Sequence, residues 1–312
     1  MTEPTDGAAA LETRPQLEVL PSRESTVGAM RVRRALPRRG LRTVGPWCFA
    51  DHMGPEQVTP TQGLDIGPHP HMGLHTVTWL LDGAVLHKDS LGSEQVIRPG
   101  QLNLMTAGRG VVHSEEAVDD YRGTLHGVQL WLAQPESARH GDPAFVHHGE
   151  LPQVTTDASD HSVLVGSFAG TASPARTDGD AALGATLATD VVVRPGRSTW
   201  PLRADFEHCV IGLRGRVRVD SAVVGDGEMV ALRTGRDDVV VEADEPARVL
   251  LLGGRPFDEP LLMFWNFVAR SRREVDAAYR DWTDHAPRFG DVASTLPRIP
   301  SPRPLWAPSP RD

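Results

Sequence analysis

Short apolar runs, each ended by glycine, proline or aspartate, recur along the chain from residue 25 to about residue 135. Examples are TVTWLLDGAVLH, EQVIRPGQLNLMTAG, GVVHSEEA and GVQLWLAQP. Runs of this length between turn-forming residues are typical of β-strands, because glycine and proline supply the backbone angles that tight turns need. The pattern therefore predicts a domain built from many short strands.

The second half of the chain repeats this pattern. VIGLRGRVRV (210–219) can be laid over TWLLDGAVLH (78–87), and VVGDGEMVALRTG (223–235) over VIRPGQLNLMTAG (96–108). Such self-similarity indicates a duplicated structural unit. The length of 312 residues also suits two domains better than one. We therefore expect an all-β protein with two tandem barrels.

Polar stretches without periodicity mark the expected boundaries. Residues 136–160 are expected to form a connection that crosses the surface. The proline-rich end favours an extended tail, and neither chain end is expected to carry chemistry. The expected segments are a flexible N-terminal segment (1–24), a first barrel (25–135), the connection (136–160), a second barrel with a helix (161–290) and the tail (291–312).

One helix is predicted near the end of the second unit. Ser271 and Glu274 have the spacing of a capping box, in which each side chain hydrogen-bonds to the backbone of the other residue. The apolar residues that follow recur at helical spacing: Val275, Ala278, Tyr279 and Trp282. The preceding run LLMFWNFV (261–268) is expected to be buried packing rather than a ligand site.

Composition and charge exclude several kinds of partner. The 30 glycines and 26 prolines agree with a turn-rich β protein. A net charge of −9 gives no attraction to nucleic acid phosphates or anionic lipid, so we expect no direct nucleic acid binding. No apolar run approaches the length of a membrane span, and the acidic start lacks the features of a signal peptide. With only two cysteines, a cytoplasmic protein without disulfides is expected.

Histidines crowd into one segment of the first unit, and two of them have the spacing of metal ligands. His69 and His71 are two residues apart, so in a strand their side chains leave the same face about 6–7 Å apart. His113 and Glu115 repeat this spacing after a glycine-rich turn. Three imidazoles and one carboxylate suit a divalent transition metal ion and leave coordination positions open.

The alternative for any single histidine is a polar surface residue or a hydrogen-bonded core residue. Two paired-ligand motifs in one unit favour metal binding for the four residues above. The other histidines keep the ordinary interpretation: His87, His126, His140, His147, His148, His161, His208 and His285.

Several longer motifs resemble the pirin family, a branch of the cupin proteins that have two barrels. The motifs are VGPWCFADHMGP (44–55), IGPHPHMGLHTVTWLLDGAVLHKDSLG (66–92), VIRPGQLNLMTAGRGVVHSE (96–115) and LLLGGRPFDEPLLMFWNFVARSRREV (250–275). The resemblance covers most of residues 31–290. It implies two tandem jelly-roll-like cupin barrels, with one metal ion per chain bound by His69, His71, His113 and Glu115. The implied ion is Fe(II) or another divalent transition metal.

The chain departs from the family beside the first histidine pair. Pirins commonly read PHPHRGFE, whereas here Met72 replaces the arginine, Leu74 the aromatic residue and His75 the glutamate. His75 is then an extra ligand, a residue that orients a ligand or bound water, or an ordinary strand residue. We favour the orienting role, because the other four residues already supply enough ligands.

The second unit is expected to have lost its metal. The counterpart of the first histidine pair is placed near residues 205–209, where only His208 is present, and the counterpart of HSE reads VVVEA (239–243). Its expected role is structural, because a second barrel covers strand edges of the first.

The resemblance implies two functions of different classes. One is a dioxygenase like quercetin 2,3-dioxygenase, acting on flavonols or other chelating small molecules, with Glu115 as the catalytic group that accepts a substrate proton. The other is a non-catalytic regulator that binds a protein partner and senses redox state through the iron. A third option is a metal that only stabilises the barrel.

Overall fold

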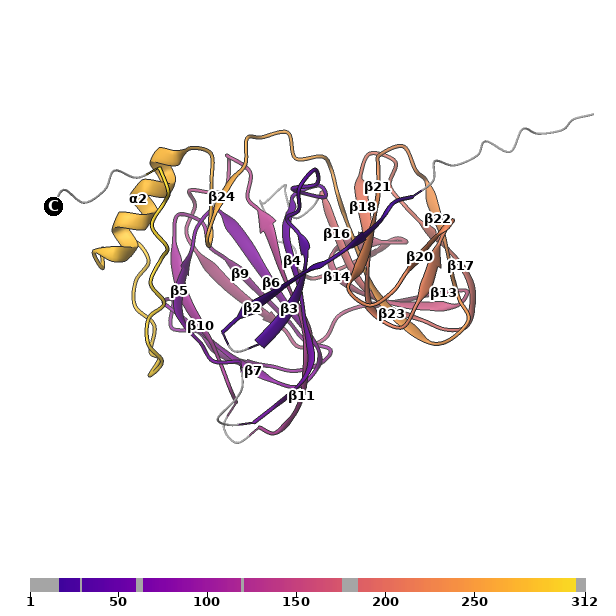
Figure 1. Ribbon diagram of the computed structural model, residues 1–312, viewed down its shortest axis with the longest axis horizontal. Coiled ribbons are helices and arrows are strands. Elements are labelled where there is room, and N and C mark those ends of the chain that lie inside the picture. The colour runs from indigo at the N-terminus through magenta and orange to yellow at the C-terminus, as the bar shows by residue number, and fades with distance from the viewer. Residues whose placement is uncertain (1–16, 29, 60–63, 119–120, 176–184, 307–312) are drawn as a thin grey trace, which may run out of the picture.

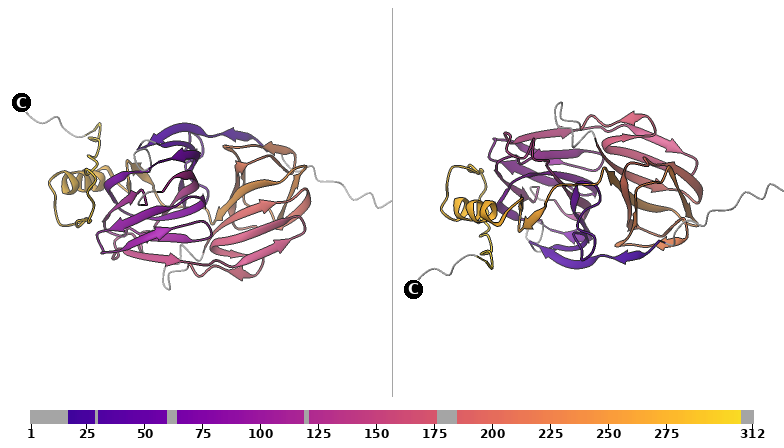
Figure 2. Two further views of the ribbon diagram at one scale, coloured as in Figure 1. Left: turned by 90° about the horizontal axis from the view of Figure 1, so that it is seen from below. Right: turned by 90° about the horizontal axis from the view of Figure 1, so that it is seen from above.

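The computed structural model describes residues 17–28, 30–59, 64–118, 121–175 and 185–306. Its strands form two β-barrels packed side by side, and the helix α2 lies on the outer side of the first barrel (Figure 1). Views from above and below show the same two-barrel arrangement (Figure 2). The all-β fold with two tandem barrels and a C-terminal helix is thus confirmed.

The first barrel consists of a seven-stranded and a four-stranded sheet, both antiparallel. The larger sheet has the order β12 (Ala144–His148), β9 (Leu102–Thr106), β6 (Leu74–Asp82), β11 (Gly123–Ala133), β4 (Trp47–Val58), β3 (Met30–Leu36) and β2 (Arg23–Val27). The smaller sheet has the order β5 (Ile66–His71), β10 (Val111–Glu116), β7 (Val85–Asp89) and β8 (Glu94–Ile97).

The second barrel has the same plan. Its larger sheet has the order β1 (Val19–Pro21), β21 (Glu228–Leu232), β18 (Glu207–Arg214), β23 (Ala247–Gly254), β16 (Thr186–Val193), β14 (Ser159–Phe168) and β13 (Gln153–Thr156), with β15 (Thr171–Ala172) beside β14. Its smaller sheet has the order β17 (Gly196–Pro201), β22 (Asp238–Ala243), β19 (Val217–Val219) and β20 (Ala222–Val224). A separate hairpin joins β24 (Leu262–Phe264) to β25 (Phe267–Ala269).

The internal repeat predicted from the sequence agrees with the strand order. The stretch 78–87 spans the end of β6 and the start of β7, and the matching stretch 210–219 spans β18 and β19. In both barrels these strands occupy the same positions, because β6 pairs with β9 as β18 pairs with β21. The two units therefore share one topology despite their divergence in sequence.

Each barrel is completed by a strand that the sequence analysis assigned to a flexible segment or a connection. Of the segment 1–24, residues 1–16 lie outside the described residues, whereas β1 pairs with β21 of the second barrel, with Val19 opposite Val230. The expected connection 136–160 contains β12, which pairs with β9, and β13, which pairs with β14. These strands are short, so their periodicity is too brief to detect, but each covers an otherwise open sheet edge.

The largest apolar cluster lies between the barrels and includes residues from both. Val77 and Trp79 on β6 pack in the same cluster as Ile211 and Leu250 of the second barrel. Trp47 also belongs to it, is fully buried, and donates its indole N–H to the Leu187 and Gly253 carbonyls at 3.1 and 3.0 Å. The barrels therefore share one core rather than meeting through a polar interface.

The helix α2 (Arg272–Thr283) begins where the capping box predicts. The Ser271 side chain accepts a hydrogen bond from the Glu274 backbone N–H at 3.3 Å. Val275, Ala278 and Trp282 are buried against the first barrel, whereas Tyr279 is half-buried. Among the described residues, no helix has the length and apolar character needed to cross a membrane.

Candidate metal centre

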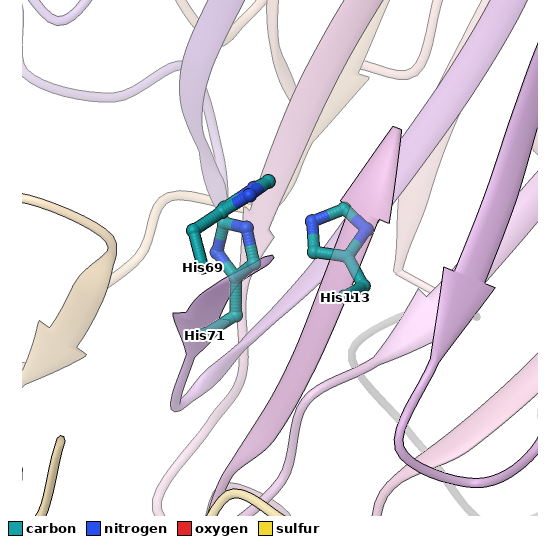
Figure 3. Close-up of side chains that lie close together, drawn as sticks. All are labelled: His69, His71 and His113. Carbon is teal, nitrogen blue, oxygen red and sulfur yellow. The ribbon is translucent and has the colours of Figure 1, made fainter. Parts of the chain in front are cut away.

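Two neighbouring strands bring three of the expected ligands together. His69 and His71 project from β5, and His113 projects from β10, which pairs with β5 so that His113 lies opposite His69 and Val111 opposite His71. Alternation of side chains along each strand then sends all three imidazoles to one face. Figure 3 shows the three rings turned toward a common point.

The three rings are close enough to share one metal ion. One ring nitrogen from each of His69, His71 and His113 lies within 4.8 Å of the others. The ring centroids are separated by 5.1 Å for His69 and His71, 4.3 Å for His69 and His113, and 4.9 Å for His71 and His113. All three side chains are buried. A tetrahedral or octahedral ion with bonds of about 2.0–2.1 Å to imidazole requires this kind of clustering.

Burial keeps these histidines in the form that binds metals. Burial lowers the pKa of His69 to about 4, and burial followed by the neighbouring imidazoles lowers the pKa of His71 and His113 well below the ordinary value. Each neutral ring has one free lone pair. In the described part of the chain, His71 Nδ1 and His113 Nε2 are buried without a hydrogen-bond partner. The donor set therefore fits a divalent transition metal ion, which would satisfy these atoms.

Glu115 lies near the histidines but outside the cluster of ligand atoms. Its side chain is buried, and it lines the same cavity as His69 and His71. Burial raises its pKa to about 7. The carboxylate is not among the atoms that lie within 4.8 Å of one another, and the register of the pairing with β5 shifts between His113 and Glu115. Its place as a fourth ligand stays a prediction.

His75 is on a different face from the three histidines. On β6 it shares a side with Val77 and Trp79, which pack between the barrels. Its Nδ1 lies 3.0 Å from the Thr106 hydroxyl. The cavity side of β6 instead carries Thr78, whose hydroxyl bonds to Gln129 in the cavity wall. The structure does not bring His75 into the ligand cluster. That His75 orients a ligand or a bound water stays a prediction, and its place on the other face of β6 does not favour it.

Hydrogen bonds from outside the cluster orient His69 and His113. His69 Nδ1 lies 2.9 Å from the Gly67 carbonyl, which can only accept, so His69 carries its proton on Nδ1 and presents the Nε2 lone pair. His113 Nδ1 lies 3.3 Å from His87 Nδ1, and His87 Nε2 lies 3.0 Å from Asp89. Because the carboxylate accepts from Nε2, a neutral His87 accepts from His113 Nδ1, which leaves His113 Nε2 for the ion.

The sequence analysis gave His87 the ordinary interpretation of a polar surface residue or a hydrogen-bonded core residue, and it did not connect His87 with His113. Its ring stacks on Phe145 of β12 at 4.4 Å, and Asp89 is held in turn by the backbone N–H groups of Leu91 and Ser93. Burial alone would raise the pKa of Asp89, but its hydrogen bonds to His87 and to the Ser93 backbone lower it below the ordinary value. The available signal was the spacing of His87 and Asp89 ahead of the motif SLG.

We predict that His87→Phe weakens metal binding about 10–100-fold without unfolding the protein, the range for residues that orient ligands. Phenylalanine retains the stacking on Phe145 but removes the acceptor for His113 Nδ1. Competition with a chromophoric chelator measures the affinity. Phe145→Leu is the matched control, because it removes the stacking partner and leaves the hydrogen bonds in place. Equal affinities of His87→Phe and the unchanged protein would refute the orienting role.

His69 and His71 line a cavity of about 410 Å³ inside the first barrel. Phe49 and Trp131 stack at 4.0 Å along one wall, and the Trp131 ring also meets His71 edge-on at 5.1 Å. Arg34 makes two hydrogen bonds to Asp51, at 2.8 and 2.7 Å, and lies 4.4 Å from the centre of the Phe49 ring. The cavity therefore combines the ligand cluster with a flat aromatic wall and one ion pair.

Part of the remaining wall comes from two segments to which no chemistry was assigned. Trp265 and Asn266, in the run 261–268 that was expected to be packing, line the cavity. Ile299, in the proline-rich tail, lines it as well. Within the described residues, the indole N–H of Trp131 is buried without a hydrogen-bond partner.

The second barrel has other residues at the corresponding positions. Its β17 pairs with β22 as β5 pairs with β10, which places Ser198 and Trp200 where the first barrel has His69 and His71, and Val241 where it has His113. The sequence analysis located the first of these counterparts near residues 205–209, which is wrong, because that stretch begins β18. The stretch 239–243, given as the counterpart of HSE, lies in β22, which pairs with β17 as β10 pairs with β5.

Two barrels of one topology, with a buried three-histidine cluster in the first, define a two-domain cupin with a candidate metal centre. The family model for pirin matches residues 29–132, and the model for the pirin C-terminal cupin domain matches residues 188–290. The chain therefore belongs to the pirin family.

Relatives with related names are similar over most of the chain. A protein of Pseudomonas aeruginosa, provisionally named a quercetin 2,3-dioxygenase, is 43% identical over 282 residues, which are 89% of this chain and 87% of the relative. A pirin-like protein of Caulobacter vibrioides is 35% identical over 272 residues, which are 85% of this chain and 92% of the relative.

Solved structures agree with the fold. A crystal structure of a quercetin 2,3-dioxygenase from Acinetobacter baumannii has a TM-score of 0.88 and 38% identity, and the match covers 95% of this chain and 97% of that chain. A bacterial pirin from Escherichia coli in complex with nickel(II) has a TM-score of 0.62 and 17% identity, over 78% of this chain and 100% of that chain.

Proposed function

We propose that the protein is a metal-dependent dioxygenase that acts on flavonols or other small molecules with adjacent metal-chelating oxygens. The observation that carries the proposal is that two members of the three-histidine cluster, His69 and His71, line a cavity of about 410 Å³ with a flat aromatic wall. A cavity of this size accommodates a small organic molecule. The names of the Pseudomonas and Acinetobacter relatives support the same substrate class.

In this proposal His69, His71, His113 and Glu115 hold one Fe(II) or other divalent transition metal ion. The ion supplies open coordination positions and Lewis acidity. Glu115 lines the cavity, and in this proposal it accepts the proton of a substrate hydroxyl as the molecule enters. The stacked rings of Phe49 and Trp131 orient a planar molecule against the cavity wall.

The test is oxygen uptake by the iron-loaded protein with a panel of flavonols and catechols. We expect uptake that depends on the metal and falls at least about a hundredfold in Glu115→Gln, within the range for a lost general base. Arg109→Gln, an exposed change that does not touch the cavity wall, is the control. A fully loaded protein that consumed no oxygen with any panel member would contradict the proposal and favour the regulatory function.

A metal that only stabilises the barrel gives a different outcome in the same experiment. Removal of the ion would then unfold the first barrel, whereas the proposed function requires a folded protein that has lost turnover. Far-ultraviolet circular dichroism before and after chelation separates the two.

We also infer a reducing compartment such as the cytoplasm. Cys48 and Cys209 are both free and buried. Burial raises the pKa of each thiol to about 12, which makes both cysteines poor nucleophiles. Their character as small apolar core residues supports this inference.

A further inference from the structure

The C-terminal tail runs back along the metal-binding strand instead of leaving the barrel. We call residues 294–301 the strap. The Ile299 backbone N–H donates to the Pro68 carbonyl at 2.9 Å, directly before the first histidine of the cluster. A Cβ atom at Gly67 would overlap the carbonyl oxygen of Pro297, so the close approach of the strap to β5 depends on that glycine.

The helix α2 holds the strap from the other side. The Trp282 indole N–H donates to the Ile299 carbonyl at 3.0 Å. The Arg298 guanidinium lies 3.2 Å from the centre of the Trp282 ring, and Trp282 itself is buried. Both backbone polar groups of Ile299 are therefore bonded, one to β5 and one to α2, so the direction of its side chain is fixed.

That side chain forms part of the cavity wall. Ile299 lines the cavity together with Ile66, His69 and Trp265, and it packs against the apolar cluster of the first barrel that contains Ile66. The wall at this point is apolar, whereas the ion pair described above makes another part of it polar. When a molecule coordinates the ion through one end, the strap therefore lies beside the part of the molecule that does not contact the ion.

The strap lies outside the part of the chain that the family models match, because the C-terminal model ends at residue 290. The three histidines, in contrast, lie within the matched part. The metal cluster is therefore a feature of the matched barrel, while this piece of wall is contributed by a segment that the family models do not cover.

We propose that the strap is a specificity element of the metal cavity, and that the Ile299 side chain limits the size of the molecule that reaches the ion. This inference rests on the proposed function, since it concerns a chelating organic ligand at the same site. Ile299 is thus a specificity-determining residue, which selects the ligand without taking part in the chemistry.

The experiment compares a compact and an extended chelating ligand, catechol and quercetin, on the protein loaded with ferric iron. The charge-transfer absorption of each complex measures binding. The quantity compared between variants is the dissociation constant of quercetin divided by that of catechol. We expect Ile299→Trp to raise this ratio about tenfold or more. We expect Ile299→Ala, which removes three carbon atoms, to lower it about tenfold or more, since one methylene group in an apolar pocket already has an effect of about tenfold. Catechol affinity should stay within about twofold in both.

Thr295→Ala is the matched control, because its side chain is exposed on the same strap. Metal content and thermal stability, measured for every variant, show that the site and the fold are intact. Ratios for both Ile299 variants that equal the control at full metal loading would overturn the role of the strap.

A second readout does not depend on ligand recognition. Gly67→Ala should push the strap away from β5 through the overlap with Pro297, and it should speed extraction of the ion by a bulky chelator about tenfold or more. An iron-loaded protein that bound neither catechol nor quercetin would argue against the proposed function, and the strap would then be judged on the extraction rate. An unchanged rate of ion extraction in both Gly67→Ala and Ile299→Ala would refute the role of the strap.

Discussion

His113→Ala should leave the purified protein nearly free of metal. The three-histidine cluster has few ligands, and the loss of one imidazole leaves two neutral rings that bind a divalent ion far more weakly. We expect affinity to fall by more than the roughly 10–100-fold that changes around the ligands cause. The same result is expected for His69→Ala and His71→Ala, while the unchanged protein holds one ion per chain.

Elemental analysis after dialysis against a weak chelator measures the occupancy. His75→Ala is the sharpest control, because His75 is a buried histidine four residues after His71 in the same motif. It should keep full occupancy, since His75 shares its strand face with Val77 and its Nδ1 is bonded to Thr106. A loss in His75→Ala equal to that in His71→Ala would overturn this assignment. Full occupancy in His113→Ala would mean that the ligands are others.

Trp47→Ala should be the most destabilising single change between the barrels. We expect it to lower the free energy of unfolding by about 3–5 kcal/mol, because this is the range for removing a fully buried large aromatic side chain. Trp47 comes from the first barrel, and its indole N–H donates to the Leu187 and Gly253 carbonyls of the second. Its removal leaves a cavity in the shared core and two buried acceptors without this donor.

Urea unfolding of the metal-free protein at constant pH measures the change. Trp47→Phe separates the two contributions, because it keeps most of the apolar volume but loses the N–H, and we expect about 1–3 kcal/mol for it. Trp306→Ala, at a half-buried position beside α2, is the control and should cost about 1 kcal/mol or less. Equal losses for Trp47→Ala and Trp306→Ala would contradict a shared core.

Much of the candidate site could be predicted from local patterns. The spacing of His69 and His71 places both side chains on one strand face whatever the rest of the fold, because strand alternation is a local property. The capping box at Ser271 is local as well, and the helix begins there. The family motifs added the partner strand with His113, which spacing alone does not position.

The remainder depends on contacts between distant parts of the chain. His87 acquires its role only because β7 and β5 flank β10 on opposite sides, which brings its ring to His113. Ile299 is an ordinary residue in a proline-rich stretch, and only its bonds to β5 and α2 place it in the cavity wall. No periodicity within a few residues carries such information.

The pairing of β1 with β21 means that the two barrels are not separable modules. Val19 and Val230 are neighbours in space although more than half of the chain lies between them, so this sheet edge is closed by one of the least local contacts in the fold. A fragment that began at β13 would expose β21 as a bare edge and would tend to associate with other copies through it. Supplying the missing strand as a separate peptide should restore the edge by strand addition, as in donor-strand complementation.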